Sequence, residues 1–459
     1  MYQIDFNKPI SVHFIGIGGI SMSSLACILK SRGYQVTGSD LKATAVTRSL
    51  EEQGITVVIG QRAENITPGI DVVVFTAAVH EDNPELIAAR AQVPRVIERS
   101  VLLGELMDEY THSIGIAGTH GKTSTSTMLS YIFLEADKDP TITIGGILEN
   151  LHSNYRIGHS DYFIAEACEY SDSFLHFHPE IGIVLNVEAE HLDYFKTYER
   201  MVDSFRKYVA GLKPSGCLVL NKDYQPLFPD YTGKMLTVSL TDPSADLTAA
   251  DICPSENHLG SSFSCIYQGQ DLGRITIHVP GSHNIFDCLC AVGAALYSGI
   301  SFDKIQSGLA QYHSPKKRFE YKGTMGGCQI IDDYAHHPSE IRATLKAARE
   351  VVQGELYVVF QPHTYSRTKA FFNDFVSALS LADHIVLADI YSASREKDPG
   401  DIHSRQISDA LKALGKDAYY FGSFTEIEDF LSKKCCPHDM LITMGAGDVV
   451  TIGEDLLSR

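Results

Sequence analysis

Residues 113–133 read SIGIAGTHGKTSTSTMLSYIF, which is a short apolar run, a glycine-rich turn and then a helical pattern. Glycines let backbone amides come close to a bound phosphate, and a helix that begins at such a turn points its positive end at the same place. The lysine can neutralise charge on the outer phosphates of ATP, and the threonine after it can supply a hydroxyl to magnesium. A glycine turn with an incidental lysine is the alternative, because Ile116 stands where the strict GxxxxGK[ST] pattern has its first glycine. We predict an ATP-binding loop made of Gly118, Thr119, His120, Gly121, Lys122, Thr123 and Ser124. We expect Lys122 to lie at a solvent-lined helix start, so that its replacement by alanine would leave the fold intact.

The same alternation of apolar runs and helical patterns continues on both sides of this loop. VHFIGIGG, QVTGSD and DVVVFT precede it, and IGIVLNV, ELYVVF and HIVLADIY are among the runs that follow. Such alternation is typical of βαβ units around mainly parallel sheets, which predicts an α/β protein. A chain of 459 residues is long for one core, so we expect three domains, at residues 1–110, 111–316 and 317–459.

Composition excludes several classes of protein. The formal net charge of −19 disfavours binding to nucleic acid and to anionic membranes, because both select surface Lys and Arg. No stretch reaches the roughly 18 apolar residues of a transmembrane helix, and the amino terminus lacks the segments of a signal peptide. We therefore expect a cytoplasmic protein without stable membrane association, as a monomer or a weak homodimer.

The ten cysteines show neither CxxC pairs nor the Cys/His spacing of zinc sites. This excludes a disulfide framework and a structural zinc, and we expect most of the cysteines to be small core residues. Cys168 is the one considered for a reactive thiol, because it lies inside the polar segment EACEYSD.

GIGGIS, residues 16–21, is a second glycine turn between an apolar run and a helical pattern. Its amides can approach a diphosphate, and Asp40 at the end of the next run can accept from a ribose hydroxyl. Serine replaces the third glycine of the GxGxxG dinucleotide pattern, however. From these residues alone NAD, another nucleotide-like ligand and a purely structural turn all stay open. The residues assigned to this site are Gly18, Gly19, Ile20, Ser21 and Asp40.

Acidic residues follow the two apolar runs after the phosphate loop. Glu166 ends YFIAE, and Glu188, Glu190 and His191 follow IGIVLNV. The carboxyl ends of parallel strands meet at one edge of a sheet, which is where metal-ligating acids lie in such folds. We predict that Thr123 and Glu166 are magnesium ligands, whereas a lone histidine is more often a surface or core residue.

Polar groups also gather after two apolar runs in the last third of the chain. The segments are IIDDYAHHPSEI, residues 330–341, and FQPHTYSRT, residues 360–368. Packing explains such groups at strand ends poorly, which favours a binding site. HHPSE can also begin a helix, with Pro338 in the first turn and Ser339 and Glu340 as capping residues.

Nine motifs occur in the order found in the Mur ligases, and the chain resembles that family from about residue 12 to residue 448. The motifs are HFIGIGGISMSSLA, GTHGKTST, EACEYSDSFL, NVEAEHLDYF, GSHNIFDCLCA, KKRFE, DDYAHHPSEI, FQPHTYSRT and ADIYSAS. The resemblance implies a Rossmann-like N-terminal domain that holds a UDP-sugar in place of NAD, a central P-loop ATPase domain and a Rossmann-like C-terminal domain that binds an amino acid. It implies the joining of L-alanine to the carboxylate of UDP-N-acetylmuramate, with ATP and Mg²⁺, through an acyl phosphate in peptidoglycan precursor synthesis.

The resemblance also implies roles for single residues. Lys122 contacts the outer phosphates, and His191 joins Glu166 at a second magnesium and so lies near the substrate. Asn284 faces adenine, and Arg318 and Asp333 reach ATP. The groups that orient the amino acid and the reacting phosphate are Tyr334, His336 and Arg367. Of all these residues, those expected to be catalytic are Lys122, His336 and Arg367, with His336 orienting or deprotonating the amine.

Three positions depart from the family pattern. Asp287 replaces an adenine-side asparagine, Thr364 replaces a basic residue and Cys168 replaces an acid. The nearest rival function is the recycling ligase that attaches a preformed tripeptide to the same sugar. An NAD-dependent oxidoreductase and a nonhydrolysing nucleotide-binding regulator are the rivals from other classes. The phosphate loop with Glu166 disfavours the first of these two, and the crowded carboxyl-terminal cluster disfavours the second.

Overall fold

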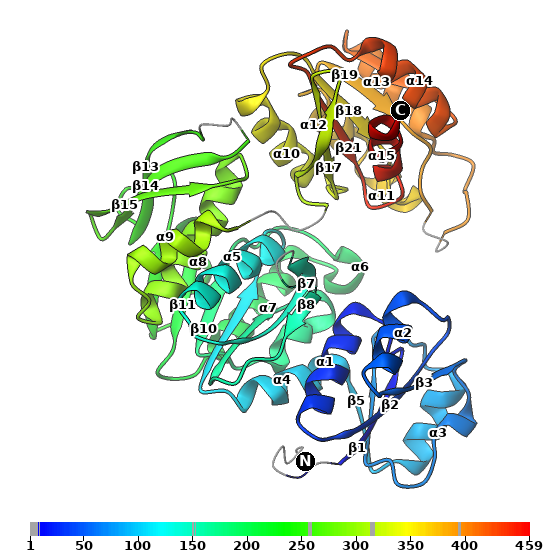
Figure 1. Cartoon of the computed structure of the whole chain (residues 1–459), viewed down its shortest axis with the longest axis vertical. Coiled ribbons are helices and arrows are strands. Elements are labelled where there is room, and N and C mark those ends of the chain that lie inside the picture. The colour runs from blue at the N-terminus through cyan, green and yellow to red at the C-terminus, as the bar shows by residue number, and fades with distance from the viewer. Residues whose placement is uncertain are drawn as a thin grey trace. The chain divides into compact units, whose positions relative to one another are not determined.

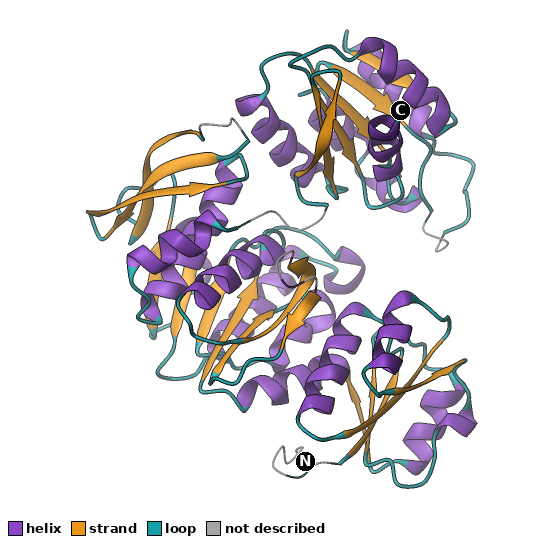
Figure 2. Ribbon diagram, in the orientation of Figure 1, coloured by secondary structure: helices purple, strands orange, loops and turns teal. Residues whose placement is uncertain are grey.

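Three β-sheets with helices packed against them organise the chain in its computed structural model (Figures 1 and 2). The structure describes residue 8 and residues 10–148, 151, 153–255, 259–312, 317–392 and 396–459. The described residues form two compact units: Met1–Thr248 with Ile266–Leu272 and Asp287–Gln311, and Ala249–Cys265 with Gly273–Phe286 and Tyr312–Arg459. The predicted α/β class is confirmed, and the exact domain boundaries stay predictions. No described helix has the length and apolar character that a membrane crossing needs.

The first sheet has five parallel strands in the order β3-β2-β1-β4-β5. β1 pairs with β2 from Ser11 opposite Gln35 to Ile15 opposite Ser39, so both strands end at the same edge. The first glycine turn follows β1 at this edge, and Asp40 ends β2 there. The elements are β1 Ser11–Ile15, α1 Ile20–Ser31, β2 Gln35–Asp40, α2 Ala45–Glu52, β3 Thr56–Ile59, β4 Val72–Phe75, α3 Pro84–Gln92, β5 Arg95–Glu98 and α4 Arg99–Asp108.

The second sheet has the order β15-β14-β13-β12-β11-β10-β6-β9-β7-β8. Its phosphate-loop strand β6 is parallel to both of its neighbours, with Ile116 opposite Glu166 of β9 and Ala117 opposite Val184 of β10. Three strand ends therefore bring the phosphate loop, Glu166 and the segment after Val184 to one edge. The strands are β6 His112–Ala117, β7 Thr141–Leu148, β8 Ser153–Arg156, β9 Tyr162–Glu166, β10 Ile181–Val184, β11 Cys217–Asn221, β12 Lys234–Val238, β13 Leu247–Pro254, β14 Ser261–Tyr267 and β15 Gln270–Ile277. The helices in this part of the chain are α5 Lys122–Glu135, α6 Leu192–Phe195, α7 Tyr198–Ala210, α8 Ser282–Tyr297 and α9 Phe302–Ala310.

The third sheet has the order β16-β17-β21-β18-β19-β20, with only β16 antiparallel to its neighbour among these strands. The carboxyl ends of β17 and β18 carry the two polar segments identified in the sequence. The strands are β16 Glu320–Met325, β17 Cys328–Asp333, β18 Leu356–Phe360, β19 His384–Leu387, β20 Asp417–Tyr420 and β21 Met440–Met444. The helices are α10 Pro338–Val351, α11 Tyr365–Ala370, α12 Phe372–Leu379, α13 Ser404–Ala413, α14 Phe424–Lys434 and α15 Val450–Ser458.

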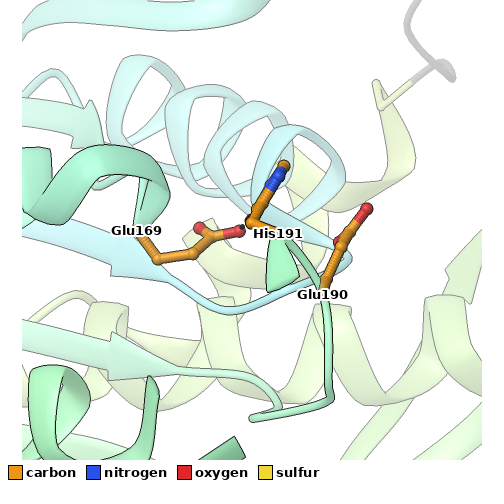
Figure 3. A group of neighbouring side chains, drawn as sticks. All are labelled: Glu169, Glu190 and His191. Atoms are coloured by element: carbon orange, nitrogen blue, oxygen red, sulfur yellow. Dashed lines mark ion pairs between the residues drawn. The ribbon is translucent and has the colours of Figure 1, made fainter. Parts of the chain in front are cut away.

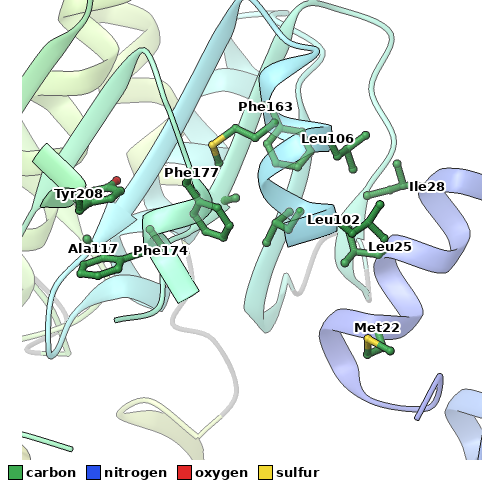
Figure 4. Packing of buried hydrophobic residues seen from close by; sticks show 14 of the residues in the cluster. Met22, Leu25, Ile28, Leu102, Leu106, Ala117, Phe163, Phe174, Phe177 and Tyr208 are labelled. Carbon is green, nitrogen blue, oxygen red and sulfur yellow. The ribbon is translucent and has the colours of Figure 1, made fainter. Parts of the chain in front are cut away.

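The cores follow from the alternation of side chains along the strands. In the third sheet Val358 and Phe360 belong to one buried cluster, and Tyr357 and Val359 belong to another. Both faces of this sheet are therefore covered, as the near-continuous apolar strands predict. In the first unit a single cluster includes side chains from α1, α4 and β9, among them Leu25, Leu102 and Phe163 (Figure 4). Six of the ten cysteines are buried and all ten are free, as expected for small core residues.

Candidate functional site

The phosphate loop lies where β6 ends and α5 begins. Gly118 and Gly121 have φ values of +147° and +85°, in the region that favours glycine. A Cβ at Gly121 would come within 2.6 Å of the carboxylate of Asp287. The backbone thus requires both glycines of GTHGKT, and α5 begins at Lys122 as predicted.

The side chain of Lys122 folds back over its own loop. Its Nζ donates to the carbonyl oxygens of Gly118 and, at 3.1 Å, of Thr119, and it lies 2.9 Å from Oε2 of Glu169. Burial acts to lower the pKa of Lys122, but the neighbouring acidic groups, with the carboxylate of Glu169 foremost, together raise it. Lys122 therefore carries a full positive charge at the place where the sequence predicts phosphate binding.

Glu169, Glu190 and His191 form a compact group beside this lysine (Figure 3). One ligand atom from each lies within 4.8 Å of the others, and Nε2 of His191 is 3.6 Å from Oε1 of Glu169. Burial opposes the charges of both residues. Lys122 nevertheless lowers the pKa of Glu169, and the hydrogen bond with Glu169 raises the pKa of His191. Two carboxylates and an imidazole can hold a divalent cation, so the donor set fits a metal.

Glu166 lies elsewhere on the same edge, although the family resemblance pairs it with His191. Its Oε1 accepts from the backbone N–H of Gly145 at 2.7 Å and from Oγ of Ser126 at 3.2 Å. Ser126 also donates to the carbonyl of Thr123 at 3.1 Å, which ties the loop helix to the end of β9. Among the described residues, the acid beside His191 is Glu169 rather than Glu166. Glu169 is the second acid of EACEYSD, and it was missed in the sequence-based assignment.

The residues before Lys122 are occupied in fixing the loop. Oγ1 of Thr119 accepts from the N–H of Glu188 at 3.0 Å, and the N–H of His120 donates to Oδ1 of Asn186 at 2.8 Å. The phosphate loop is thereby fastened to the segment that follows β10. That segment also carries Glu190 and His191, so one set of contacts positions both halves of the site.

At the first glycine turn, Asp40 already has a backbone partner. Its Oδ2 accepts from the N–H of Gly18 at 2.8 Å. Oγ of Ser21 accepts from Nη1 of Arg99 at 3.0 Å, and the carbonyl of Ile20 accepts from Asn154 at 3.1 Å. Asp40 and Ser21 therefore shape the turn in this structure, and their contact with a sugar nucleotide stays a prediction.

The predicted adenine-side residues are buried at the start of α8. Nδ2 of Asn284 donates to the carbonyl of Pro280 at 2.7 Å, so the amide holds its own turn. Asp287, one helical turn later, is 4% exposed and lies against Gly121 of the phosphate loop. The contact of Asn284 with adenine stays a prediction.

The predicted amino-acid residues do come together at the end of β17 and β18. The rings of Tyr334 and His336 are 5.2 Å apart, and those of His336 and His363 are 5.9 Å apart. Nη1 of Arg367 donates to the carbonyl of His363 at 3.1 Å. His363 completes this group, although it was not assigned a role from the sequence.

Asp333 and Arg318 lie at the base of the same group. Asp333 is 5% exposed and accepts from the N–H groups of Phe319 and Ala335 at 2.9 and 2.7 Å. Burial raises the pKa of Asp333, whereas Arg318 acts in the opposite direction. The guanidinium of Arg318 lies 5.8 Å over the ring of Tyr334.

Cys168 does not have the surroundings of a reactive thiol. Burial raises its pKa, and the neighbouring carboxylate of Glu169 raises it further. A low pKa is what makes a cysteine nucleophilic at neutral pH. The packing interpretation of Cys168 therefore has the better support.

Family models match the chain in three consecutive parts: the Mur ligase family catalytic domain over residues 11–111, the Mur ligase middle domain over 116–295 and the glutamate ligase domain over 317–447. The chain belongs to the Mur ligase family. This Mur ligase is 49% identical to the UDP-N-acetylmuramate–L-alanine ligase of Agathobacter rectalis, with 100% of both chains covered. It is 45% identical to the enzyme of the same name from Acetivibrio thermocellus, covering 99% of this chain and 97% of that protein.

Solved structures agree with this assignment. The crystal structure of UDP-N-acetylmuramate–alanine ligase from Thermotoga maritima matches this Mur ligase with a TM-score of 0.80 and 28% identity, covering 98% of this chain and 99% of that one. A murein peptide ligase from Psychrobacter arcticus matches with a TM-score of 0.65 and 23% identity, over 98% of each chain, which is a likeness of fold. The family and three-domain architecture predicted from the nine motifs are confirmed.

Proposed function

We propose that this chain is a cytoplasmic ligase, monomeric or weakly dimeric, that joins L-alanine to the carboxylate of UDP-N-acetylmuramate at the expense of ATP. The observation that carries the proposal is the buried, charged Lys122 within a GTHGKT loop, in a chain that alanine ligases match from end to end. A charged lysine at the start of a helix is what the outer phosphates of ATP require. The choice of alanine as the amino acid rests on the names of the relatives and on the residues found in the motifs.

In the first step the sugar carboxylate oxygen attacks the γ-phosphorus of ATP, and ADP leaves. An acyl phosphate results. Lys122 exchanges its carbonyl partners for phosphate oxygens and stabilises the charge that spreads over them in the transition state. The first glycine turn holds the UDP part through backbone amides at the start of α1, and Asp40 shapes that turn from β2.

Magnesium would neutralise charge on the phosphates and polarise the transferring group. Thr123 and Glu166 are assigned to one ion, as the family resemblance implies. Glu169, Glu190 and His191 are the described residues that would hold a second one. Their carboxylate oxygens are the hard donors that this ion prefers.

In the second step the amine nitrogen of L-alanine attacks the acyl carbon, and inorganic phosphate leaves. The amine must first lose a proton, and we assign its orientation or deprotonation to His336. Nδ1 of His336 lies 3.1 Å from the carbonyl of Tyr334, a contact that helps to orient the imidazole ring. Arg367 is assigned to the alanine carboxylate, because a planar guanidinium matches it with two parallel hydrogen bonds.

The decisive experiment measures phosphate release from ATP in the presence of UDP-N-acetylmuramate while single amino acids are added in turn. L-Alanine should lead, with weaker release for L-serine and glycine, because one methylene or hydroxyl changes selectivity by only about 1 to 3 kcal/mol. Competition with L-alanyl-γ-D-glutamyl-diaminoacid tripeptide tests the recycling alternative. A preference for the tripeptide would contradict the alanine assignment and leave the ligase chemistry standing.

A further inference from the structure

Three buried polar side chains beneath the first glycine turn have no part in the mechanism above. They are His13 on β1, Ser39 on β2 and Glu85 on α3, which are 2%, 0% and 0% exposed. Nε2 of His13 lies 2.7 Å from Oε1 of Glu85, and Oγ of Ser39 donates to Oε2 of the same carboxylate at 2.7 Å. Both carboxylate oxygens thus have partners, and three elements meet at one buried group.

Thr37 extends this contact on the far side of the histidine. Its Oγ1 lies 2.8 Å from Nδ1 of His13, so both ring nitrogens have a partner. A buried carboxylate without partners would cost several kcal/mol, whereas one fixed from two sides is held in a single geometry. His13, Thr37, Ser39 and Glu85 are called the Glu85 network below.

The backbone of Ser39 connects the Glu85 network to the glycine turn. The carbonyl of Ser39 accepts from the N–H of Gly16 at 2.8 Å and from the N–H of Ile17 at 2.9 Å. The next residue, Asp40, accepts from the N–H of Gly18. Three consecutive amides of the turn are therefore oriented by two consecutive residues of β2, and the first of these is anchored to Glu85.

The turn has no room to adopt another position against β2. A Cβ at Gly38 would come within 2.7 Å of the carbonyl oxygen of Phe14 and within 2.6 Å of Cδ1 of Ile17. The two strands and the turn are thus in direct contact at this point. A small movement of β2 would be transmitted to the turn amides.

We propose that the Glu85 network is a positioning device that fixes the first glycine turn for the diphosphate of the UDP-sugar. The inference rests on the proposed function, because it takes this turn as the sugar-nucleotide site. None of the four side chains needs to touch the substrate. Their effect is to hold the Ser39 carbonyl, and hence the backbone of residues 16–18 that donates to Ser39 and Asp40. That backbone sets the position of the amides in the first turn of α1, which would receive the diphosphate, and N–H···O bonds weaken steeply when misaligned.

Ser39→Ala and Glu85→Gln test the Glu85 network in the full-length enzyme. Each should raise the KM for UDP-N-acetylmuramate about tenfold, because displaced backbone amides would lose about one hydrogen bond to the charged diphosphate. The kcat and the KM for ATP should stay within about twofold of the values for the unaltered enzyme, because the phosphate loop that is assigned to ATP follows a strand of another sheet. Ser39→Thr keeps the hydroxyl and should restore most of the affinity for the UDP-sugar.

Glu105→Gln is the matched control in the same part of the chain. Glu105 on α4 forms a partly buried ion pair with Arg95, with Nη1 of Arg95 donating to Oε2 at 3.1 Å. Loss of this ion pair should lower the free energy of unfolding without changing the KM for UDP-N-acetylmuramate or the KM for ATP. If Ser39→Ala and Glu85→Gln only lower stability in the same way, the Glu85 network is structural and the proposal is overturned.

Amide hydrogen exchange separates this proposal from the location of the UDP-sugar. In the unaltered protein, UDP-N-acetylmuramate should slow exchange at residues 20–22, in the first turn of α1, and Ser39→Ala should weaken that protection. No protection in the unaltered protein would remove the sugar nucleotide from this turn, and the positioning role would fall with it. Full protection in both proteins, with equal KM values, would overturn the positioning role alone.

Discussion

Lys122 and Glu169 neutralise each other beside the phosphate loop, and this pairing decides what a lysine substitution should do. The lysine side chain is 16% exposed and the glutamate 1% exposed. From the sequence we expected Lys122 at a solvent-lined helix start, where its removal would leave the fold unaffected. The structure corrects that expectation, because removing one partner of a buried pair leaves the other charge uncompensated.

Lys122→Ala should therefore reduce both turnover and stability. We expect at least about a hundredfold loss of phosphate release, through lost stabilisation of the transferring group. We also expect a loss of about 3 to 5 kcal/mol in the free energy of unfolding, measured with denaturant. The double variant Lys122→Ala/Glu169→Gln should recover much of the stability and none of the turnover. Equal stability of the single and double variants would contradict the pairing, and near-normal turnover would contradict the role of the lysine.

Arg367→Lys should raise the KM for L-alanine several-fold more than the KM for ATP. A point charge would replace the planar fork that matches a carboxylate, and the contact of Nη1 with the carbonyl of His363 would be lost. Arg349→Lys is the matched control. Arg349 forms an ion pair with Asp383, with 2.8 Å between Nη2 and Oδ2, and neither residue belongs to the group around His336. Steady-state kinetics with each substrate varied in turn checks the prediction. Equal changes in both KM values would remove Arg367 from the amino-acid site.

Single residues could be predicted where a motif joins a chemical type to a strand end. Tyr334, His336 and Arg367 were found in this way, and the structure brings them together. Glu396 could not be found, because it comes from a segment about thirty residues after the loop that it holds. Its carboxylate accepts from Oγ1 of Thr364 at 2.8 Å and from the N–H of Ser366 at 3.0 Å. Such contacts depend on which chain segments lie side by side in the folded protein, and the local sequence pattern does not predict that.

At the scale of elements, the start of α10 satisfies two interpretations at once. The predicted helix start at Pro338 is confirmed, and Glu340 completes a capping box as predicted. The N-cap, however, is His337 and not Ser339, whose N–H donates to the His337 side chain. The carboxylate of Glu340 lies 3.4 Å from Nδ1 of His336 and 3.9 Å from Arg318. The capping residues therefore also position the groups assigned to the substrate.

Strand β17 ends in two buried acids, and one of them makes stability depend on pH. Burial raises the pKa of Asp332 from 3.8 to about 6, although Thr443 donates to its Oδ1 at 2.7 Å. An acid whose pKa is raised by folding favours the native state when protonated. Its contribution is therefore present below about pH 4 and is lost as the pH rises through about 6. A difference of about two pKa units corresponds to roughly 3 kcal/mol.

Asp332→Asn should abolish this part of the pH dependence. Other acids titrate in both proteins, so the informative quantity is the difference between their free energies of unfolding. That difference should shift by about 2 kcal/mol in favour of the variant between pH 4.5 and pH 8. Denaturant unfolding at the two pH values measures it. An unchanged difference would mean that Asp332 titrates in the folded protein as it does in the unfolded chain.

For the whole molecule, the central parallel strands could be predicted and the peripheral ones largely could not. Strands such as β6 and β18 are buried on both faces and read as apolar runs. Strand β13 is buried at Leu247 and exposed from Asp251 to Pro254, so it lacks that signal. β7 and β8 were also missed, since TITIGGIL contains two glycines and SNYR has no apolar periodicity. β7 pairs with β8 and with β9, and β13 pairs with β12, so the paired strands and not the apolar pattern place them in the sheet.

The net charge of −19 gives local cations their importance. ATP and a UDP-sugar are both polyanions, and the field of the whole protein repels them. We therefore expect binding to depend on a few fixed groups, and those assigned here are Lys122 and backbone amides in the first unit and Arg318 and Arg367 in the second. Affinity for both nucleotides should come from these sites rather than from general attraction.

The last prediction uses the thermal stability of the intact chain to choose between a UDP-sugar and NAD. The turn GIGGIS belongs to the unit that begins with Met1–Thr248, so its ligand should stabilise that unit. A ligand at about 100 times its Kd stabilises the folded state by about 2.7 kcal/mol, which raises the Tm of a domain of this size by roughly 5 °C. Differential scanning calorimetry should find this rise with UDP-N-acetylmuramate and no change with millimolar NAD. UMP at the same concentration is the control for the missing diphosphate and should give a much smaller rise, because the turn amides would have only one phosphate to hold. A rise with NAD and none with the UDP-sugar would bring back the oxidoreductase alternative for the first domain.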